Sequence, residues 1–339
     1  MVYFSNRNNL WISTIQITKK MAEQTKIPIP PRTPPKVQSL RFCDVDALTE
    51  AVHSSQFEHL QIEPGAFLAD LQRVIFDDLI IDTGCYTRKV IARGNFPPGC
   101  ALLGCVLNSR EEGYINGYRF NRNDVVIFPK SSELDYIQPA GTLWYAIALS
   151  EALLEQAGCQ EIPIDRIKVM PGNWPLTQLL RGFFQNQPDP TAGVACDARA
   201  PSVSKATLLD QVRYVLEHYQ GDPNVRRPSL QRRMAIVRQF ERHVCERIAE
   251  PLRIPELCSE MGVSPRVLEY VFKEELGMTP KRYLELLRLS AFRRELSRSR
   301  FGNKAISEIA EHYGIRHLGR FSAAYQRQFG ELPSETLKR

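Results

Sequence analysis

The sequence predicts an α+β protein, in which a β-rich N-terminal domain precedes an all-α C-terminal domain with two helix-turn-helix units. Three observations lead to this prediction. Between residues 59 and 148, short apolar segments alternate with turn signals such as Pro97-Pro98-Gly99, as in antiparallel sandwiches and barrels. In the last third of the chain, one helix–glycine–helix pattern occurs twice. Charge is uneven too, because residues 231–339 hold 21 Lys and Arg against 14 Glu, whereas residues 1–230 are nearly neutral.

The first segment, residues 1–36, is expected to be a disordered leader. Five prolines lie between positions 28 and 35, and such spacing favours an extended, mobile chain. The segment lacks the apolar core of a secretory signal, and no stretch approaches the roughly 18 uninterrupted apolar residues of a membrane span. The protein is therefore expected in the cytoplasm, with no membrane partner and with Met21 as an alternative start.

Residues 37–160 are expected to form the β-rich domain. Apolar segments bounded by Gly, Pro, Asn and Asp favour short strands. The predicted strands are His59–Ile62, Phe67–Val74, Leu79–Thr83, Arg88–Ala92, Ala101–Leu107, Tyr114–Phe120, Asp124–Pro129, Glu133–Ile137 and Leu143–Ala148.

This domain shows no pattern of a metal or catalytic site. Only His53 and His59 lie near the predicted strands, and neither has a second histidine at ligand spacing. The eight cysteines show no CxxC spacing and are expected to be free thiols. We therefore predict no metal, no cofactor and no enzymatic activity.

A barrel without a metal can still enclose a small molecule. Aromatic residues on the predicted strands are the candidates for lining such an effector site. The alternative is that they belong to the core, which is the more frequent role of an aromatic side chain on a strand. The candidates are Tyr114, Tyr118, Phe120, Tyr136 and Trp144.

Residues 161–229 are expected to form a helical connector. Residues 206–219 carry apolar side chains at helical spacing, whereas residues 186–204 are rich in Pro, Ala and Asp and favour a loose segment. The apolar face of the helix has two interpretations of nearly equal weight. It pairs with its copy in a homodimer, or it covers the β sandwich.

Residues 230–339 are expected to form the all-α domain, which a helix over residues 232–250 opens. Two turns follow, at Gly262 and Gly314. Glycine is expected there because a sharp turn between packed helices often needs a positive φ, which glycine adopts at little cost.

The helix after Gly262 is expected to begin at Ser264, a residue type that caps helix N-termini. Leu268, Phe272 and Leu276 recur every fourth residue and form a buried stripe. The opposite face is free to contact a partner. It carries Arg266, Glu269, Tyr270 and Lys273.

The second copy repeats this arrangement. Phe321, Tyr325 and Phe329 form the equivalent stripe. The exposed face of this unit is expected to hold Arg316, His317, Gly319, Arg320, Ser322, Ala323 and Gln326.

Between the two units, residues 280–300 are expected to form one long amphipathic helix. At about 1.5 Å per residue it would hold the units roughly 30 Å apart, which approaches the roughly 34 Å of one turn of B-DNA. A single copy of the pattern would fit any helical bundle. Two copies in register, in a region of net positive charge, favour DNA binding, with Lys273 and Arg320 beside the predicted recognition surfaces.

At these residues the chain resembles the AraC/XylS family of bacterial transcription regulators. The resemblance covers about 105 residues. It rests on Ile254–Val263, Leu268, Phe272 and Gly277 in the first unit and on Ile306, Ile309–Ala310, Gly314, Phe321, Tyr325, Phe329–Gly330 and Pro333 in the second. Residues 317–322 and 329–337 look most like the branch that contains the ethanolamine-operon regulator.

The resemblance implies base-contacting positions in both units. In the first it places them at Arg266, Glu269 and Tyr270, and in the second at Leu318, Gly319, Ser322 and Ala323. The second set is mostly small or apolar, which departs from members that use Gln or Arg there. Residues 117–129 also look like the second half of a cupin-type jelly roll, the usual sensory fold of this family.

The implied function is that of an effector-responsive transcription regulator. Its expected partners are promoter DNA, RNA polymerase, a small-molecule effector and a second copy of the chain. Two alternatives stay open on the sequence. One is a sequence-independent DNA-architectural protein, and the other, less favoured, is a cupin enzyme fused to a DNA anchor.

Overall fold

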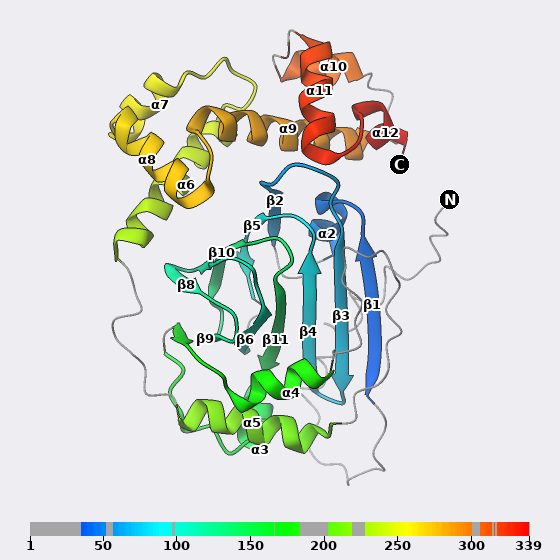
Figure 1. Cartoon of the computed structure of the whole chain (residues 1–339), viewed down its shortest axis with the longest axis vertical. Helices are drawn as coiled ribbons and strands as arrows, with labels where there is room; N and C mark the ends of the chain where they lie inside the picture. Colours follow the sequence, from blue (N-terminus) through cyan, green and yellow to red (C-terminus); the bar gives the residue numbers. More distant parts are fainter. Residues whose placement is uncertain are drawn as a thin grey trace. The chain divides into compact units, whose positions relative to one another are not determined.

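A computed structural model describes residues 35–51, 57–96, 99–165, 167–183, 203–218, 228–299, 306–313, 315 and 317–338. The chain divides into two compact units, one built mainly from residues before 224 and the other mainly from residues after it (Figure 1). Most of the predicted leader, residues 1–34, lies outside the described residues.

The first unit contains two antiparallel sheets. The seven-stranded sheet has the order β1-β3-β4-β11-β6-β9-β12, and the five-stranded sheet has the order β2-β5-β10-β7-β8. The strands are β1 (Lys36–Phe42), β2 (Glu58–Gln61), β3 (Ala69–Phe76), β4 (Leu79–Tyr86), β5 (Val90–Asn95), β6 (Ala101–Asn108), β7 (Gly113–Ile115), β8 (Tyr118–Phe120), β9 (Val125–Phe128), β10 (Glu133–Gln138), β11 (Leu143–Leu149) and β12 (Lys168–Met170).

Eight of the nine predicted strands match one observed strand each, and the ninth is corrected. The segment predicted as one strand over residues 114–120 is two strands, β7 and β8. Asn116 (φ 47°) and Gly117 (φ 94°) turn the chain between them. An Asn-Gly pair with both φ values positive forms a tight hairpin turn, and the sequence prediction missed this signal. It also missed β1, β12 and the short helix α2 (Val45–Ala51).

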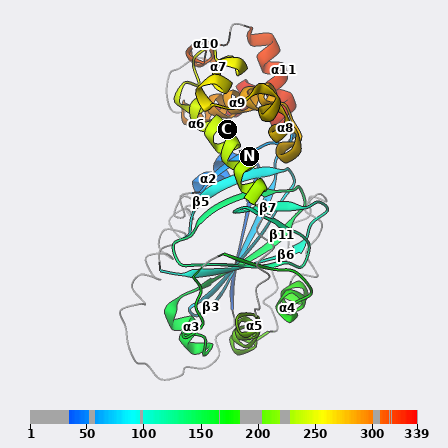
Figure 2. The ribbon, with the colours of Figure 1, turned by 90° about the vertical axis from the view of Figure 1, so that its left-hand side faces the viewer.

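Three helices cover one face of the seven-stranded sheet: α3 (Glu151–Gln156), α4 (Pro175–Phe183) and α5 (Lys205–Glu217) (Figure 2). The strands alternate accordingly. In β11, Tyr145 and Ile147 face this helical layer and are at most 1% exposed, while their neighbours Ala146 and Ala148 are half-buried. The alternation follows from the two-residue repeat of a strand.

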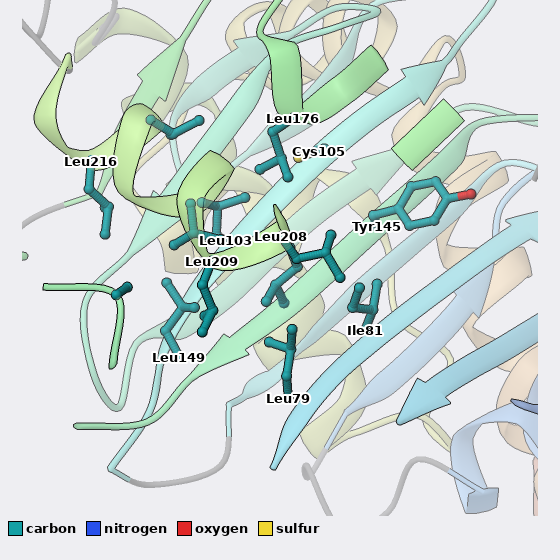
Figure 3. Packing of buried hydrophobic residues seen from close by; sticks show 14 of the residues in the cluster. Leu79, Ile81, Leu103, Cys105, Tyr145, Leu149, Leu176, Leu208, Leu209 and Leu216 are labelled. Carbon is teal, nitrogen blue, oxygen red and sulfur yellow. The ribbon is translucent and has the colours of Figure 1, made fainter. Parts of the chain in front are cut away.

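Helix α5 places its apolar side chains against this sheet. Leu208, Leu209 and Leu216 are buried and lie toward strand residues such as Leu103 and Leu149 (Figure 3). Burial of each leucine contributes about 1.5–3 kcal/mol. Of the two interpretations of this helix, the structure therefore shows the one in which it covers the sheet.

The predicted boundary between a β domain and a helical connector over residues 161–229 is wrong for the residues that the structure describes. Strand β12 pairs with β9, and α4 and α5 contribute to the same hydrophobic core as the strands. These segments belong to the first unit. Residues 184–202 and 219–227 lie outside the described residues.

The second unit is helical. Its helices are α6 (Pro228–Glu246), α7 (Ile254–Met261), α8 (Pro265–Leu276), α9 (Pro280–Ser299), α10 (Ile306–His312), α11 (Leu318–Phe329) and α12 (Pro333–Lys338). No helix among the residues described in either unit is long and apolar enough to cross a membrane.

Helix α9 is not amphipathic, which corrects the prediction for residues 280–300. It packs against α6 and α8 near its start and against α10 and α12 farther along (Figure 1). Apolar residues are consequently buried around its circumference. They are Tyr283, Leu284, Leu286, Leu287, Leu289, Phe292 and Leu296.

Candidate nucleic-acid interface

The turn between α7 and α8 has the geometry that the sequence predicts. Gly262 adopts φ 63° and ψ 29° and ends α7, and its backbone N–H donates to the carbonyls of the preceding turn. Ser264 then caps α8, because its side-chain oxygen accepts a hydrogen bond from the Val267 N–H at 3.3 Å. Helix, short turn and capped second helix together form a helix-turn-helix unit.

Helix α8 buries one face and exposes the other. Leu268, Phe272 and Leu276 form the buried stripe, as predicted, and Val271 and Glu275 extend it. The carboxylate of Glu275 is held there by an ion pair with Arg233 of α6. All four predicted contact residues of this helix are exposed: Arg266, Glu269, Tyr270 and Lys273.

Basic side chains of this unit divide into paired and unpaired groups. Arg247 binds Glu260 on the surface, and Arg282 donates to the Gln328 side chain at 3.1 Å. By contrast, Arg266, Lys273 and Arg320 form no ion pair with any described residue. Their charges are available for an anionic partner, which DNA phosphates or a base edge would supply.

Helices α10 and α11 form the second pair. Gly314 and Arg316, which lie between these helices in the sequence, are outside the described residues. His317, Leu318, Gly319, Arg320 and Ala323 are exposed, and Ser322 is half-buried. A Cβ added to Gly319 would meet no atom within 4 Å, so the helix backbone is open at this point. The predicted base-contact positions of α11 therefore carry mostly smaller side chains than those of α8.

Each pair of helices is held to α9 by an aromatic cluster. In the α7–α8 pair, the centre of the Phe272 ring lies 4.8 Å from that of Phe240 of α6 and 5.3 Å from that of Tyr283 of α9. In the α10–α11 pair, the ring centre of Phe292 of α9 lies 4.7 Å from that of Phe321, and the ring centres of Tyr325 and Phe329 are 4.8 Å apart. Edge-on contacts of this kind add to the stabilisation from buried area.

A buried ion pair also joins α9 to the segment between α11 and α12. The Arg293 guanidinium lies 2.8 Å from the Glu331 carboxylate, and the two side chains are only 4% and 6% exposed. Arg293 also sits 4.8 Å from the centre of the Phe329 ring. Thr336 of α12 donates to the same carboxylate at 2.8 Å. These contacts make Arg293 a structural residue rather than part of a solvated basic face.

The five aromatic residues predicted to line an effector site do not share one face. Tyr114 pairs with Ile137, the neighbour of Tyr136 in β10. Successive residues of a strand point to opposite faces, so Tyr114 and Tyr136 lie on opposite sides of the five-stranded sheet. Phe120 packs over Gly113, where an added Cβ would lie 2.0 Å from its ring. Tyr118 is half-buried in β8.

Tyr136 and Trp144 do come together through Tyr86. The ring centre of Tyr86 lies 6.3 Å from that of Trp144, and the Tyr86 hydroxyl is hydrogen-bonded to the Tyr136 side chain. The Trp144 indole occupies space left by Gly84, where a Cβ would be 2.7 Å from the indole Cζ2. Sequence reasoning found these two residues but not Tyr86.

His59 completes this buried cluster. Its Nδ1 lies 3.3 Å from the Thr49 hydroxyl, and its Nε2 lies 3.4 Å from the Tyr136 hydroxyl. Burial lowers the pKa of His59 to about 4, so the imidazole is neutral at pH 7. Within the described ranges, no group of three His, Cys, Asp or Glu side chains is arranged to hold a metal ion.

Sequence reasoning also missed Val267. Its side chain is 44% exposed in the first turn of α8, beside Arg266. The available signal was an apolar residue outside the buried stripe of the helix, a position that the polar pattern of the predicted contact residues does not include.

Comparisons with known proteins agree with this geometry. Residues 257–339 match the family model described as a helix-turn-helix domain. The chain is 37% identical over 89 residues to the probable thc operon regulatory protein of Rhodococcus erythropolis, covering 26% of this chain and 27% of that protein. It is 32% identical over 171 residues to the XylDLEGF operon transcriptional activator of Pseudomonas putida, covering 48% and 50%. The matches therefore span half or less of the length of these relatives.

A solved structure extends the comparison. The chain is 30% identical to a probable AraC family transcriptional regulator from Rhodopseudomonas palustris, covering 31% of this chain and 96% of that one, with a TM-score of 0.29. Together with the helix-turn-helix match and the operon regulators, this sequence identity shows that the chain belongs to the AraC/XylS family of transcriptional regulators.

Proposed function

We propose that the whole protein is a sequence-specific, DNA-binding transcription activator whose N-terminal unit responds to a small-molecule effector. The observation that carries the proposal is the face of α8 with Arg266 and Lys273, which are exposed and have no ion-pair partner among the described residues. A capped turn positions this helix, and the second helix of such a unit enters the major groove. The similarity to proteins named as operon activators supports activation, rather than repression, of transcription.

The second pair of helices, α10 and α11, is proposed to engage the same DNA duplex. Its basic group is Arg320, with Arg316 and His317 just before α11 in the sequence. Helix α9 has 20 residues and is thus about 30 Å long. That length suits two recognition helices that read successive major grooves.

The two antiparallel sheets of the first unit are proposed to be a cupin-like sensory domain. The candidate effector contacts are reduced to Tyr136 and Trp144, which are half-buried and lie in one cluster with the buried Tyr86 and His59. An effector that binds one arrangement of the protein better than another would shift the population toward it and so alter DNA occupancy. RNA polymerase and a second copy of the chain are proposed as further partners.

Within the AraC/XylS family, the sequence of residues 317–322 and 329–337 suggests the branch that contains the ethanolamine-operon regulator.

Selection from random DNA duplexes with the full chain tests the DNA-binding function. We expect one enriched motif, and we expect the Arg266→Ala variant to enrich a relaxed version of it. Recovery of duplexes with no shared motif, despite tight binding, would instead identify a sequence-independent architectural protein. Mapping of bound sites and transcripts in cells with and without the protein then gives the sign of regulation.

A further inference from the structure

Large apolar side chains are rarely exposed in the described parts of this chain. Four such side chains are more than 40% exposed: Tyr214 at 41%, Leu318 at 42%, Val267 at 44% and Tyr270 at 54%. Three of the four lie on α8 and α11. Single exposed apolar side chains are common on protein surfaces, so exposure alone identifies no partner. What sets Val267 and Leu318 apart is their place in the first turns of α8 and α11, the part of a recognition helix that meets base edges.

Val267 has no role in the core of its own unit. The buried stripe of α8 is complete without it, and only its backbone N–H takes part in the cap at Ser264. A β-branched residue also lowers helix propensity compared with alanine. Its side chain therefore contributes little to folding, yet it stands in the first turn of α8, the part of a recognition helix that contacts base edges.

Leu318 has a similar position in the α10–α11 pair. It is the first residue of α11, and its neighbour Gly319 has open space where a Cβ would lie. The helix can therefore approach a base closely at this point. Leu318 is the largest apolar side chain exposed on that surface.

The major groove offers one prominent apolar group, the C5-methyl of thymine. We propose that Val267 and Leu318 each contact a thymine methyl group. The DNA sites of this protein then carry one T·A pair under the first turn of α8 and another under the first turn of α11. This inference rests on the proposed DNA-binding function and adds to it the base that each unit recognises by apolar contact.

Replacing thymine with deoxyuridine provides the test, because it removes the methyl group and preserves base pairing. The probe is the duplex selected with the full chain, made with one deoxyuridine at a time. At the two predicted positions we expect the wild-type protein to bind about three- to fivefold more weakly, as for the loss of one buried methyl group. At the other thymines we expect no change.

The variants assign each contact. Val267→Ala should lose the sensitivity at the α8 position and keep it at the α11 position, and Leu318→Ala should do the reverse. Tyr214→Ala, which truncates the exposed aromatic residue of α5, is the matched control and should keep both. Both test residues are exposed, so their variants should retain the helical circular dichroism and melting of the wild type.

Three results would overturn the inference. One is a selected motif with no thymine under either helix. Another is equal binding of the wild type to thymine and deoxyuridine duplexes. The third is a Val267→Ala variant that keeps its deoxyuridine sensitivity and DNA affinity but fails to activate transcription, which would assign the exposed valine to a protein contact. Failure of the selection to enrich any motif would refute the proposed function itself.

Discussion

On α8, Arg266 and Lys273 carry the same charge but differ in what they can recognise. The Arg266 guanidinium is a planar fork that matches the two acceptors of guanine, whereas the Lys273 ammonium is a compact charge suited to a phosphate. Both side chains are exposed and lack an ion pair with the described residues. Their chemistry, rather than their burial, predicts different roles.

Arg266→Ala should weaken binding to the selected site by about 1–3 kcal/mol and relax the preference at one base pair, because a bidentate contact is lost. Lys273→Ala should weaken binding to all duplexes nearly equally. It should also reduce the salt slope of log K by about one, as for one phosphate contact. Fluorescence anisotropy over a KCl series, with the selected duplex and its single-base variants, measures both effects. If the two substitutions gave the same sequence-independent loss, this assignment of roles would be wrong.

His59 makes the stability of the first unit depend on pH. Its pKa is about 4 in the fold and about 6.5 in the unfolded chain. Between these values the unfolded chain binds the extra proton, so stability is fully present above about pH 6.5 and is lost as pH falls toward 4. From pH 7.5 to pH 5 the loss is about 2 kcal/mol.

Urea unfolding at these two pH values measures this loss. The three tryptophans are Trp11, Trp144 and Trp174, so all of them lie in the first unit, on which indole fluorescence therefore reports. We expect the free energy of unfolding to depend less on pH in His59→Gln than in the wild type. His218→Gln, which changes an exposed histidine, should behave as the wild type. An unchanged pH dependence in His59→Gln would contradict the buried, neutral state of this imidazole.

At the scale of elements, α9 is the helix whose environment differs most from its sequence pattern. It contacts α6, α8, α10 and α12, so side chains on several of its faces are buried. One of them is Arg293, whose charge is compensated by Glu331 and whose guanidinium contacts the Phe329 ring. The helix thus connects the α7–α8 and α10–α11 pairs through core packing as well as chain continuity.

Arg293→Ala should destabilise the helical unit by about 3–5 kcal/mol, because it leaves the Glu331 carboxylate buried without its partner. Arg293→Met combined with Glu331→Gln should cost less, since neither buried charge remains. Urea unfolding followed by far-ultraviolet circular dichroism at the helical band measures both variants. Equal losses in the single and double variants would contradict this, because methionine restores most of the arginine's volume and the double variant leaves no buried charge uncompensated.

At the scale of the whole molecule, the two helix pairs predict the extent of the DNA site. A protomer that engages both should protect nearly two turns of DNA, roughly 17–20 base pairs, with determinants about 10 base pairs apart. DNase or hydroxyl-radical footprinting measures this span. A protected region near 10 base pairs would refute engagement by both helix pairs.

The two halves of that site should be unequal. Arg266, Glu269 and Tyr270 give α8 polar groups for base contacts, whereas Leu318, Gly319 and Ala323 leave α11 with methyl contacts, groove shape and backbone contacts. Substituting base pairs under α11 should therefore cost less than substituting those under α8. A base-pair scan of the selected duplex tests this, and equal costs in the two halves would refute the asymmetry.

The amino-acid sequence by itself determined the features that depend on local spacing. The positive φ at Gly262, the cap at Ser264 and the buried stripe of Leu268, Phe272 and Leu276 all follow from residues a few positions apart. The series of strands over residues 59–148 follows from the same kind of signal, because turn residues and the two-residue repeat act within a short segment. Such features are set before any distant partner is in place.

Only the tertiary structure decided which faces meet. An apolar stripe on residues 206–219 requires a partner but does not name one, and the fold supplies the seven-stranded sheet. Strand register separates Tyr114 from Tyr136, although both are aromatic residues on strands. Arg293 has the sequence pattern of a surface arginine until Glu331, 38 residues later in the chain, neutralises it in the core. In each case the missing information is long-range, since burial and ion pairing depend on elements that are distant in sequence.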